Sequence, residues 1–323
     1  MPEGDEKVSV TVALVTRDRK TELRKALRSV LEQDTTPEIV VLDDASTDGT
    51  SEMLRDEFPS VRVHRQEPAL GTTLARNLVT SLAGSDIVIH LDDDAWFTSG
   101  ETVSRTIADF DHPRVGIVAV PFVDLVDGRQ TARNVRAPDH DVWVAATYTG
   151  ASYAARTDIF TQVGGYDREY RMYGEERDLS LRLLAAGFVT RMGSAEPVVH
   201  APSPTRSLVR MDILGRRNEI VWSWRSFPAP WHLLYIAGYV VMGLWVGIRV
   251  RRLRRMIRGV IEGFRAIPTV HRDPVSRETF ALDRRLRRKG PRRLSEIEFM
   301  LPPLAEVAQP ARAPRDQRSI ASS

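Results

Sequence analysis

Short apolar runs alternate with helical patterns along the first part of the chain, and no other feature of the sequence constrains the fold as strongly. The apolar runs, which we expect to be strands, cover residues 8–15, 38–43, 61–65 and 86–91. Helices are predicted between them, over residues 21–33, 47–58 and 72–82. This alternation predicts an α/β fold with a doubly wound, mostly parallel sheet. Ligands of such sheets bind at the carboxyl ends of the strands, so the polar residues after each strand are candidate site residues.

Length and composition exclude several classes of protein. A chain of 323 residues with 42% hydrophobic and 28% charged residues can bury one large core or two modest ones. This balance rules out collagen-like, fully disordered and polytopic membrane proteins. The sequence has no cysteine, which excludes disulfide scaffolds and cysteine-zinc sites. Residues 1–7 form a polar N-terminal tail without the apolar core of a signal peptide, so we do not expect export by that route.

Acidic clusters stand where the sheet argument places a site. Asp43 and Asp44 follow the second strand, and the three consecutive aspartates Asp92, Asp93 and Asp94 follow the fourth. Neighbouring carboxylates repel one another and are costly to desolvate, and a divalent cation relieves both effects. All-oxygen ligands suit Mg²⁺ or Mn²⁺, and Mg²⁺ usually binds carboxylates together with substrate phosphates. The clusters therefore indicate a phosphorylated ligand, although aspartates after a strand also form ordinary turns and helix caps.

A third cluster begins the helix expected over residues 175–186. Glu175 and Glu176 lie in its first turn, where the positive end of the helix dipole favours the ionised carboxylate. An ionised, partly shielded carboxylate that faces a substrate can act as a general base. The alternative is that these glutamates only stabilise the start of the helix.

Taken in order, these segments resemble the glycosyltransferase family 2 pattern on a GT-A-type fold. The resemblance runs from Val8 to about Asn218. It rests on the strand ending in VTR (15–17), VLDDASTDGT (41–50), GTTLARN (71–77), LDDD (91–94), GGYD (164–167) and YGEERDL (173–179), followed by Arg182 and Gly187. The resemblance implies an inverting transfer of sugar from a UDP-, dTDP- or GDP-linked donor to an acceptor hydroxyl, with Mg²⁺ or Mn²⁺ as cofactor.

The resemblance also implies roles for residues around the donor nucleotide. Thr16 and Asp44 would hold the base, and Arg76 would lie near the nucleotide and the aspartates. Asp93 would lie near the ribose. Arg17 stands where the family usually has an aromatic residue, and its guanidinium could stack on the base.

Further roles concern the metal and the chemistry. Asp92 and Asp94 match the Asp-x-Asp motif, with Asp94 as the metal ligand, and His200 matches a histidine that contacts metal or diphosphate. Glu176 occupies the place of the catalytic base. Two neighbouring acids of the same helix, Glu175 and Asp178, would support the site or the acceptor.

Two other functions stay open at this point. A nucleotidyltransferase on a similar sheet normally has a glycine-rich phosphate loop after the first strand, whereas Thr16 is followed here by Arg-Asp-Arg. A catalytically silent binding protein could share the fold. The presence of Glu176 together with Asp92 and Asp94 argues against a silent protein.

The formal net charge of +3 combines two regions of opposite sign. Residues 1–200 hold 22 Lys and Arg against 33 Asp and Glu, a net charge of −11, whereas residues 201–323 hold 24 against 10, a net charge of +14. Within the basic region, residues 231–248 are an apolar run of 18 residues, and six arginines follow from Arg249 to Arg258. The basic region therefore has a different partner from the acidic one.

A membrane surface is the partner that this basic region favours. Positive charge on both sides of residues 231–248 disagrees with a single transmembrane span, and favours an interfacial or re-entrant segment on the cytoplasmic side of the cell membrane. Residues 253–267 continue it as an amphipathic helix, typical of binding to anionic lipid. The apolar residues of this helix are Leu253, Met256, Ile257, Val260, Phe264 and Ile267, opposite Arg251, Arg254, Arg255 and Arg258.

Other uses of the basic region compete with lipid binding. The apolar run could span the membrane, or pack on the catalytic domain or on a second subunit in a homodimer. Nucleic acid is not expected, because the arginines border an apolar run and no base-reading motif accompanies them. A membrane segment also favours a glycan or lipid-linked acceptor, as in cell-envelope synthesis.

The resulting division of the chain has four parts. They are a tail (1–7), a GT-A catalytic domain (8–218), membrane-associating helices (219–270) and a basic C-terminal extension that is partly disordered (271–323). Within the catalytic domain, residues 115–120 and 142–146 read as short strands, and residues 127–139 as an exposed loop.

Overall fold

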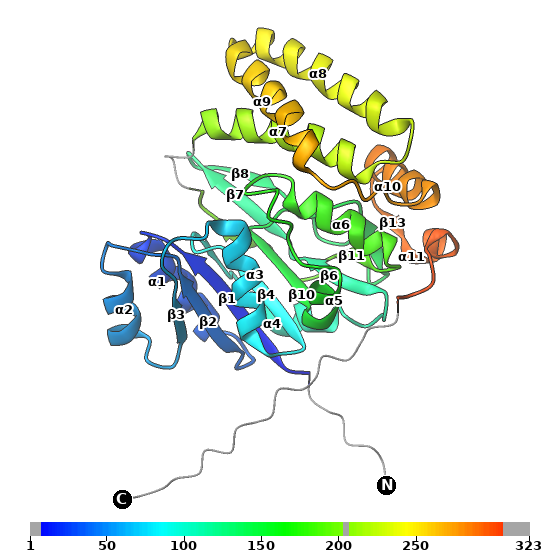
Figure 1. Cartoon of the computed structure of the whole chain (residues 1–323). Coiled ribbons are helices and arrows are strands. Elements are labelled where there is room, and N and C mark those ends of the chain that lie inside the picture. The colour runs from blue at the N-terminus through cyan, green and yellow to red at the C-terminus, as the bar shows by residue number, and fades with distance from the viewer. Residues whose placement is uncertain (1–7, 203–206, 306–323) are drawn as a thin grey trace, which may run out of the picture.

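The computed structural model describes residues 8–202 and 207–305. Its centre is a nine-stranded sheet in the order β13-β9-β11-β6-β10-β4-β1-β2-β3 (Figure 1). The four strands expected first along the chain lie together and parallel at one end. They are β1 (Val10–Thr16), β2 (Glu38–Asp43), β3 (Arg62–Arg65) and β4 (Ile87–Leu91). Because Thr16 pairs with Asp43, β1 and β2 end side by side.

Helices cover both faces of this sheet, so the predicted doubly wound α/β fold is confirmed. The side chains of β1 divide between the faces, since Val12 and Leu14 enter one hydrophobic cluster and Ala13 another. The first cluster includes residues of α1 (Lys20–Leu31), α2 (Thr50–Glu57) and α4 (Thr102–Ala108). The opposite face packs on α3 (Thr72–Ala83), α5 (Thr157–Gln162) and α6 (Glu175–Ala185).

Beyond β4 the sheet becomes mixed. β10 (Ser152–Arg156) runs antiparallel to both β4 and β6 (Val115–Ala119). β11 (Val189–Met192) is parallel to β6 and antiparallel to β9 (Trp143–Ala145). The aspartates thus follow strands of the parallel part, β4-β1-β2-β3. β10 lies between this part and the mixed part of the sheet.

A separate four-stranded sheet lies beside the site, in the order β5-β12-β7-β8. Its strands are β5 (Ala95–Trp96), β12 (Val198–His200), β7 (Phe122–Val126) and β8 (Arg129–Ala132). β8 falls inside the segment 127–139 that was expected to be a loop. Its residues are exposed as predicted, but they pair with β7 as a hairpin through Asp127 and Gly128, which both adopt positive φ.

The helices α7 (Leu208–Ser226), α8 (Trp231–Arg249) and α9 (Leu253–Ala266) form a layer above the sheets in Figure 1. α7 crosses the expected boundary between residues 218 and 219, so the catalytic part and this helical layer share one helix. α9 packs tightly on α7 through glycines. A Cβ at Gly259 would lie 2.6 Å from the carbonyl oxygen of Ile213, and a Cβ at Gly263 would lie 2.9 Å from Ile220 Cβ.

The apolar face expected on residues 253–267 divides between two environments. Met256 is buried together with the glycines of α9, whereas Ile257 and Phe264 are exposed. The difference has a physical reason. α9 comes closest to α7 at its glycines, and a hydropathy pattern does not count glycines as part of an apolar face. Two α9 surfaces result, one packed on α7 and one open.

The described part of the C-terminal extension folds back on the large sheet. Leu282 and Leu286 of α10 (Arg277–Lys289) and Leu294 of α11 (Leu294–Ile297) join the main hydrophobic core. Between these helices, β13 (Arg292–Arg293) pairs with β9 at the sheet edge. The disorder expected at the end of the chain concerns residues 306–323, which lie outside the described residues.

Candidate active site

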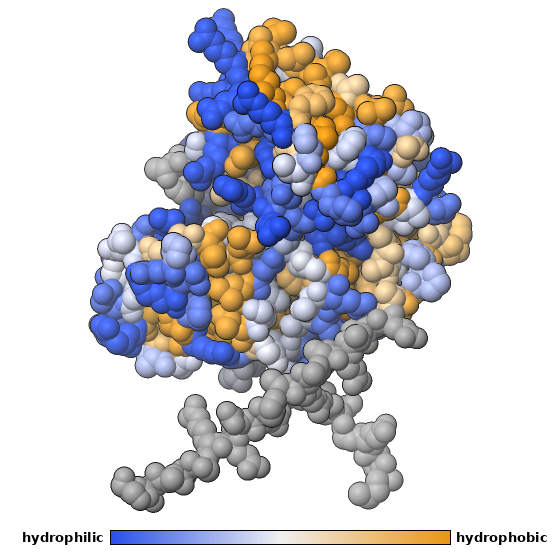
Figure 2. Space-filling view, viewed as in Figure 1, coloured by the Kyte–Doolittle hydropathy of each residue, from blue (hydrophilic) through white to orange (hydrophobic). Residues whose placement is uncertain are grey.

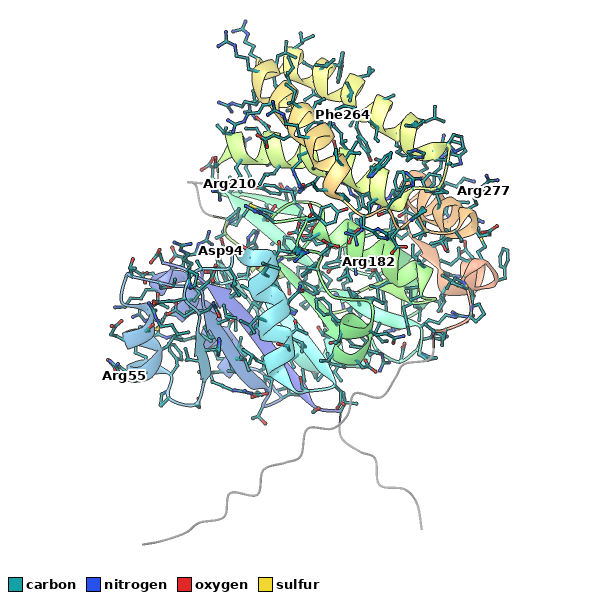
Figure 3. All side chains as sticks on the ribbon, in the orientation of Figure 1. Arg55, Asp94, Arg182, Arg210, Phe264 and Arg277 are labelled. Atoms are coloured by element: carbon teal, nitrogen blue, oxygen red, sulfur yellow. The ribbon has the colours of Figure 1, made fainter. Side chains whose placement is uncertain are left out.

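The carboxyl ends of β1 and β4 bring Thr16 and the three aspartates together. Figure 3 labels Asp94 at this edge of the sheet, below the helical layer. Asp93 and Asp94 are buried, and Asp92 is half-buried. The strand-end argument therefore located the acidic group correctly.

Asp93 is held from two sides. Its carboxylate accepts hydrogen bonds from Thr16 Oγ1 at 2.8 Å and from Arg19 Nη1 at 3.0 Å. Burial raises the pKa of Asp93 to about 7, although the positive charge of Arg19 opposes this shift. The same guanidinium also contacts the carboxylate of Asp94. Arg19 thus supplies positive charge to two of the three aspartates.

Asp94 bonds on its other side to His200, whose Nε2 lies 3.2 Å from Asp94 Oδ1. His200 Nδ1 lies 2.6 Å from Asp124 Oδ1, so the imidazole stands between two carboxylates. Burial alone would lower the pKa of His200, but the hydrogen bond and charge of Asp94 outweigh it and raise the pKa to about 9. Burial would likewise raise the pKa of Asp94, and the His200 hydrogen bond and charge, with those of Arg19, lower it instead.

Three of these residues can hold a divalent cation. Asp92, Asp94 and His200 each offer one ligand atom, and these atoms lie within 4.8 Å of one another. Two carboxylate oxygens and an imidazole nitrogen suit Mg²⁺ or Mn²⁺. Asp124 would orient the imidazole through Nδ1, which is the usual outer partner of a metal-binding histidine. The donor set therefore fits the expected cation, provided that His200 binds as the neutral imidazole.

Arg76 connects the aspartates to the predicted base. It is buried on α3, and its Nη2 donates to the carboxylate of Asp92 and, at 2.9 Å, to the carbonyl oxygen of Gly150. The backbone N–H of Gly150 donates to Glu176 Oε1 at 3.1 Å. A Cβ at Gly150 would lie 2.6 Å from Arg76 Nη1 and 2.8 Å from Glu176 Oε1, so only glycine leaves room for both groups.

Glu175 and Glu176 begin α6 as predicted, but burial outweighs the expected effect of the helix dipole, and both have raised pKa values. Burial, and then the charge of Glu176, raises the pKa of Glu175 to about 8. Burial also raises the pKa of Glu176, against the opposing charge of Arg76. A carboxylate whose pKa is raised in this way is a stronger base than an ordinary glutamate.

A cavity of about 280 Å³ opens beside Glu176, between the start of α6 and α7. Its lining includes Tyr148 and Tyr173 on one side and Gly215 and Glu219 of α7 on the other. A substrate in this cavity would contact Glu176 and the helical layer together.

The other predicted residues have different surroundings. Asp44 is buried, and its two oxygens accept from the backbone N–H groups of Leu70 and Gly71, at 2.7 and 2.9 Å. Arg17 is exposed, with Asp18 as its ion-pair partner at 3.8 Å. Asp178 is buried and pairs with Arg182, away from the aspartate group. Arg182 also donates to the carbonyl oxygens of Val163 and Gly165, so Asp178 helps to hold the loop that precedes α6.

Sequence reasoning missed Arg19 and Asp124. An arginine that follows a strand opposite three aspartates was a signal for Arg19. Asp124 gave none, because it reaches His200 only through the parallel pairing of β7 with β12, in which the two residues are partners.

Comparisons with known proteins agree with this architecture. The sequence profile of Glycosyl transferase family 2 matches residues 11–214. The N-acetylglucosaminyl-diphospho-decaprenol L-rhamnosyltransferase of Mycobacterium tuberculosis (strain H37Rv) is 26% identical over 275 residues, covering 70% of this chain and 88% of that protein. The uncharacterized glycosyltransferase YwdF of Bacillus subtilis is 27% identical over 222 residues, covering 66% of this chain and 81% of YwdF.

Solved structures show the same fold. The mannosyltransferase PcManGT from Pyrobaculum calidifontis, in complex with GDP-Man and Mn²⁺, superposes with a TM-score of 0.55 at 18% identity, covering 82% of this chain and 89% of that one. Residues 1–349 of S. aureus TarS, in complex with UDP-GlcNAc, give a TM-score of 0.59 at 15% identity and cover 90% of both chains. With the family profile matched over most of the sheet domain, the chain belongs to glycosyltransferase family 2 and has a GT-A fold.

Proposed function

We propose that the protein is an inverting, metal-dependent glycosyltransferase. An acceptor hydroxyl attacks the anomeric carbon of a nucleotide-diphosphate sugar from the face opposite the diphosphate. The new C–O bond forms as the bond to the diphosphate oxygen breaks, and the nucleoside diphosphate leaves with the electron pair. The hydroxyl proton passes to Glu176. The observation that carries this proposal is that Arg76, which pairs with Asp92, and Glu176 both bind the backbone of Gly150.

Glu176 is suited to the role of base by its surroundings. Its raised pKa favours proton uptake, and it lines the cavity where an acceptor would enter. Glu175, which is more deeply buried, would keep its own proton at neutral pH, because burial and Glu176 raise its pKa to about 8. Glu175 would therefore support Glu176 and not replace it.

The donor would lie along the carboxyl ends of β1, β2 and β4. Thr16, Asp44 and Asp93 are the proposed contacts of the nucleoside, and Arg17 would stack on its base. Asp94, Asp92 and His200 would hold Mg²⁺ or Mn²⁺, which supplies Lewis-acid neutralisation of the charge on the leaving diphosphate. Neighbours of the same fold were solved with GDP-Man and Mn²⁺ and with UDP-GlcNAc, which supports a nucleotide sugar without selecting UDP, dTDP or GDP.

A lipid-linked acceptor is the proposed second substrate. The Mycobacterium tuberculosis relative is named for transfer to a diphospho-decaprenol-linked sugar. The cavity beside Glu176 is bounded by α7, so an acceptor held at the helical layer reaches the base from that side. A glycan of the cell envelope is the corresponding product.

The helical layer is the proposed contact with the membrane. α8 is the one helix among the described residues that is long and apolar enough to span, and 17% of its apolar window is buried. Figure 2 shows hydrophobic residues gathered over the helical layer at the top of the molecule, next to hydrophilic ones. The large exposed apolar residues of α8 and α9 are Leu233, Leu234, Val241, Met242, Leu244, Trp245, Ile248, Ile257, Ile261 and Phe264.

We propose that this layer lies in the plane of the membrane, on the cytoplasmic side. α8 packs along both α7 and α9, and Gly243 of α8 closely contacts Arg216 of α7, so α8 is one part of a layer and not an isolated span. A groove on α9 alternates Arg254, Arg258 and Arg265 with Ile257 and Ile261, which suits anionic headgroups above acyl chains.

Donor binding and transfer test the proposal separately. Thermal-shift screening of UDP-, dTDP- and GDP-sugars with and without Mn²⁺ should find one nucleotide that stabilises the protein only with metal. The selected donor is then incubated with polyprenyl-diphosphate-linked sugars, and transfer is followed by mass spectrometry. Metal-dependent donor binding without transfer or donor hydrolysis by the intact chain would favour a silent binding protein, and no donor binding would refute the proposal.

A further inference from the structure

The turn that carries Glu176 has an unusual backbone. Tyr173 has φ 69° and Gly174 has φ 100°, so two successive residues are left-handed just before α6 begins. A tyrosine pays a steric penalty at positive φ, and such a conformation persists only where the surrounding structure fixes it. No side chain caps the start of α6. Some other group must therefore hold this turn.

Asn218 is that group. It lies on α7 and is 1% exposed. Its Nδ2 donates to the carbonyl oxygens of Met172 at 2.9 Å and of Tyr173 at 2.7 Å. Its Oδ1 accepts from Arg217 Nη1 at 2.8 Å, which fixes the orientation of the amide. Both amide hydrogens thus bind the two carbonyls that immediately precede Gly174.

The neighbours of Asn218 attach the same segment to α7. Arg217 donates to the carbonyl oxygen of Glu169 at 2.9 Å and pairs with its carboxylate at 3.1 Å. Arg225, two turns along α7, pairs with Asp167. Residues 167–173 are therefore fixed to one helix at several points, and Asn218 is the point nearest to Glu176.

α7 is in turn fixed by α8 and α9, the other two helices of the helical layer. Arg216 Nη1 donates to the carbonyl oxygen of Tyr239 in α8 at 3.1 Å. The glycine contacts of α9 with Ile213 and Ile220 leave no room for a side chain between the two helices. A shift of α8 or α9 would therefore move α7, and with it the turn before Glu176.

We propose that Asn218 is a positioning residue for the catalytic carboxylate and connects it to the helical layer. This inference rests on the proposed role of Glu176 as base. Replacing Asn218 with Asp would set a carboxylate against two carbonyl oxygens and release the turn. The donor contacts lie on β1, β2 and β4, which α7 does not hold. The turnover number should therefore fall while donor binding remains.

The test compares Asn218→Asp and Asn218→Ala with Ser223→Ala in the full chain. Ser223 is buried on the same helix and donates to the carbonyl oxygen of Glu219 at 2.8 Å, so its variant removes one buried hydrogen bond of α7 without touching the turn. We expect kcat to fall by about tenfold to a hundredfold in both Asn218 variants, since displacement of a reacting group by about 1 Å costs that much. The donor Kd with Mn²⁺ should stay within about twofold of wild type, as for Ser223→Ala.

Two further measurements separate positioning from loss of folding. Trypsin should cleave faster after the exposed Arg168 or Arg171 in the Asn218 variants, because the turn is released. In a Tyr173→Asn background, Asn218→Ala should cost a smaller factor in kcat than it does in the wild type, because asparagine adopts positive φ more readily than tyrosine. Gly263→Val would insert a side chain between α9 and α7. It should lower kcat and leave the donor Kd unchanged.

The outcomes decide between the two proposals. Wild-type kcat in Asn218→Asp, or equal loss of kcat and donor affinity, overturns the positioning role. An equal factor lost to Asn218→Ala in the wild-type and Tyr173→Asn backgrounds overturns the account of the turn, and wild-type kcat in Gly263→Val overturns the connection to the helical layer. If Glu176→Gln itself turns over at the wild-type rate, Glu176 is not the base and the positioning role of Asn218 falls with it, whereas absence of donor binding by the wild type would refute the proposed function.

Discussion

The aspartate edge of the sheet and the α7–α9 layer both concentrate charge, but they compensate it differently. At the sheet edge, Asp92, Asp93 and Asp94 each pair with a cationic side chain inside the protein. In the helical layer, Arg254 and Arg258 are exposed beside exposed isoleucines. The first region is internally neutralised and can exchange an internal cation for a bound one. The second keeps the charge of Arg254 and Arg265 for a partner outside the chain, whereas Arg258 of the same groove pairs with Glu262.

The largest effect should come from the base at the acidic region. Glu176→Gln removes the proton acceptor but keeps the hydrogen bond from Gly150, so kcat should fall about a thousandfold while donor binding persists. Glu196→Gln, which removes an exposed carboxylate paired with Arg136, is the matched control. Wild-type turnover in Glu176→Gln would refute the assignment of Glu176 as base.

Removing a metal ligand should have the next largest effect. Asp94→Ala should weaken Mn²⁺-dependent donor binding by about a hundredfold, because it removes the carboxylate shared by His200 and Arg19. Chelation of metal from the wild type should reproduce the loss, whereas Asp56→Asn, at an exposed acid, should not. Calorimetry of donor binding with and without Mn²⁺ measures this. Unchanged metal dependence in Asp94→Ala would exclude Asp94 as ligand.

The helical layer should respond to a different measurement. Arg254→Gln with Arg265→Gln, at two exposed arginines of the α9 groove, should weaken binding to vesicles of mixed neutral and anionic lipid by about thirtyfold, since each arginine contributes about 1 kcal/mol at such a surface. The controls are Arg55→Gln with Arg105→Gln, which remove two exposed arginines of the sheet domain. Figure 3 labels Arg55 at the opposite end of the molecule from Phe264 of α9. Flotation with neutral and anionic vesicles measures binding.

Two results would contradict this interpretation of the layer. Equal flotation with neutral and anionic vesicles would mean that the arginines serve another partner. Release of the protein from cell extracts by nuclease, and not by detergent, would identify that partner as nucleic acid.

The pH dependence of turnover should show the burial of Glu176. Its pKa is raised above the ordinary value of 4.5, and the base works only when ionised. Activity is therefore present above the raised pKa and is lost as the pH falls through it. We expect the acidic limb of kcat, at saturating donor and Mn²⁺, above pH 4.5. A limb at or below that value would mean that the carboxylate is not desolvated in the working enzyme.

The two regions were also predictable to different degrees. Local signals were enough for the aspartates, because apolar runs mark the strands and the residues directly after a strand lie at its carboxyl end. The choice of Glu176 as base rested on the family resemblance as well as on its place at a helix start, and it stays a prediction. Asp124 and Asn218 could not be found so, because each reaches the site from an element distant in sequence: β7 pairs with β12, and α7 crosses above the turn at Tyr173.

Composition predicted the basic layer but not its packing. The apolar residues of α9 suggested a single face, whereas glycines decide which surface meets α7 and which stays open. Close helix contact depends on the absence of side chains, and no hydropathy pattern records that. We therefore expect the membrane contact of α9 to involve only its exposed residues, such as Ile257 and Phe264, and not its whole apolar face.

The smallest effect should come from Arg19, and its sign makes it the sharpest test of the comparison. Arg19 pairs with Asp93 and Asp94 and is about one-third exposed. Its positive charge therefore competes with a metal ion for these carboxylates. Arg19→Gln should therefore tighten Mn²⁺ binding in the absence of donor, by about fivefold at most, because a partly exposed ion pair is worth about 1 kcal/mol or less. Electron paramagnetic resonance of free Mn²⁺ measures this without any turnover. Arg24→Gln, on the helix that Arg19 precedes but paired with Glu57, should leave the affinity unchanged. Weaker Mn²⁺ binding in Arg19→Gln would show that Arg19 helps to organise the site. The aspartates would then need Arg19 even with metal bound. In that case the aspartate edge and the helical layer would differ only in how deeply their charged side chains are buried.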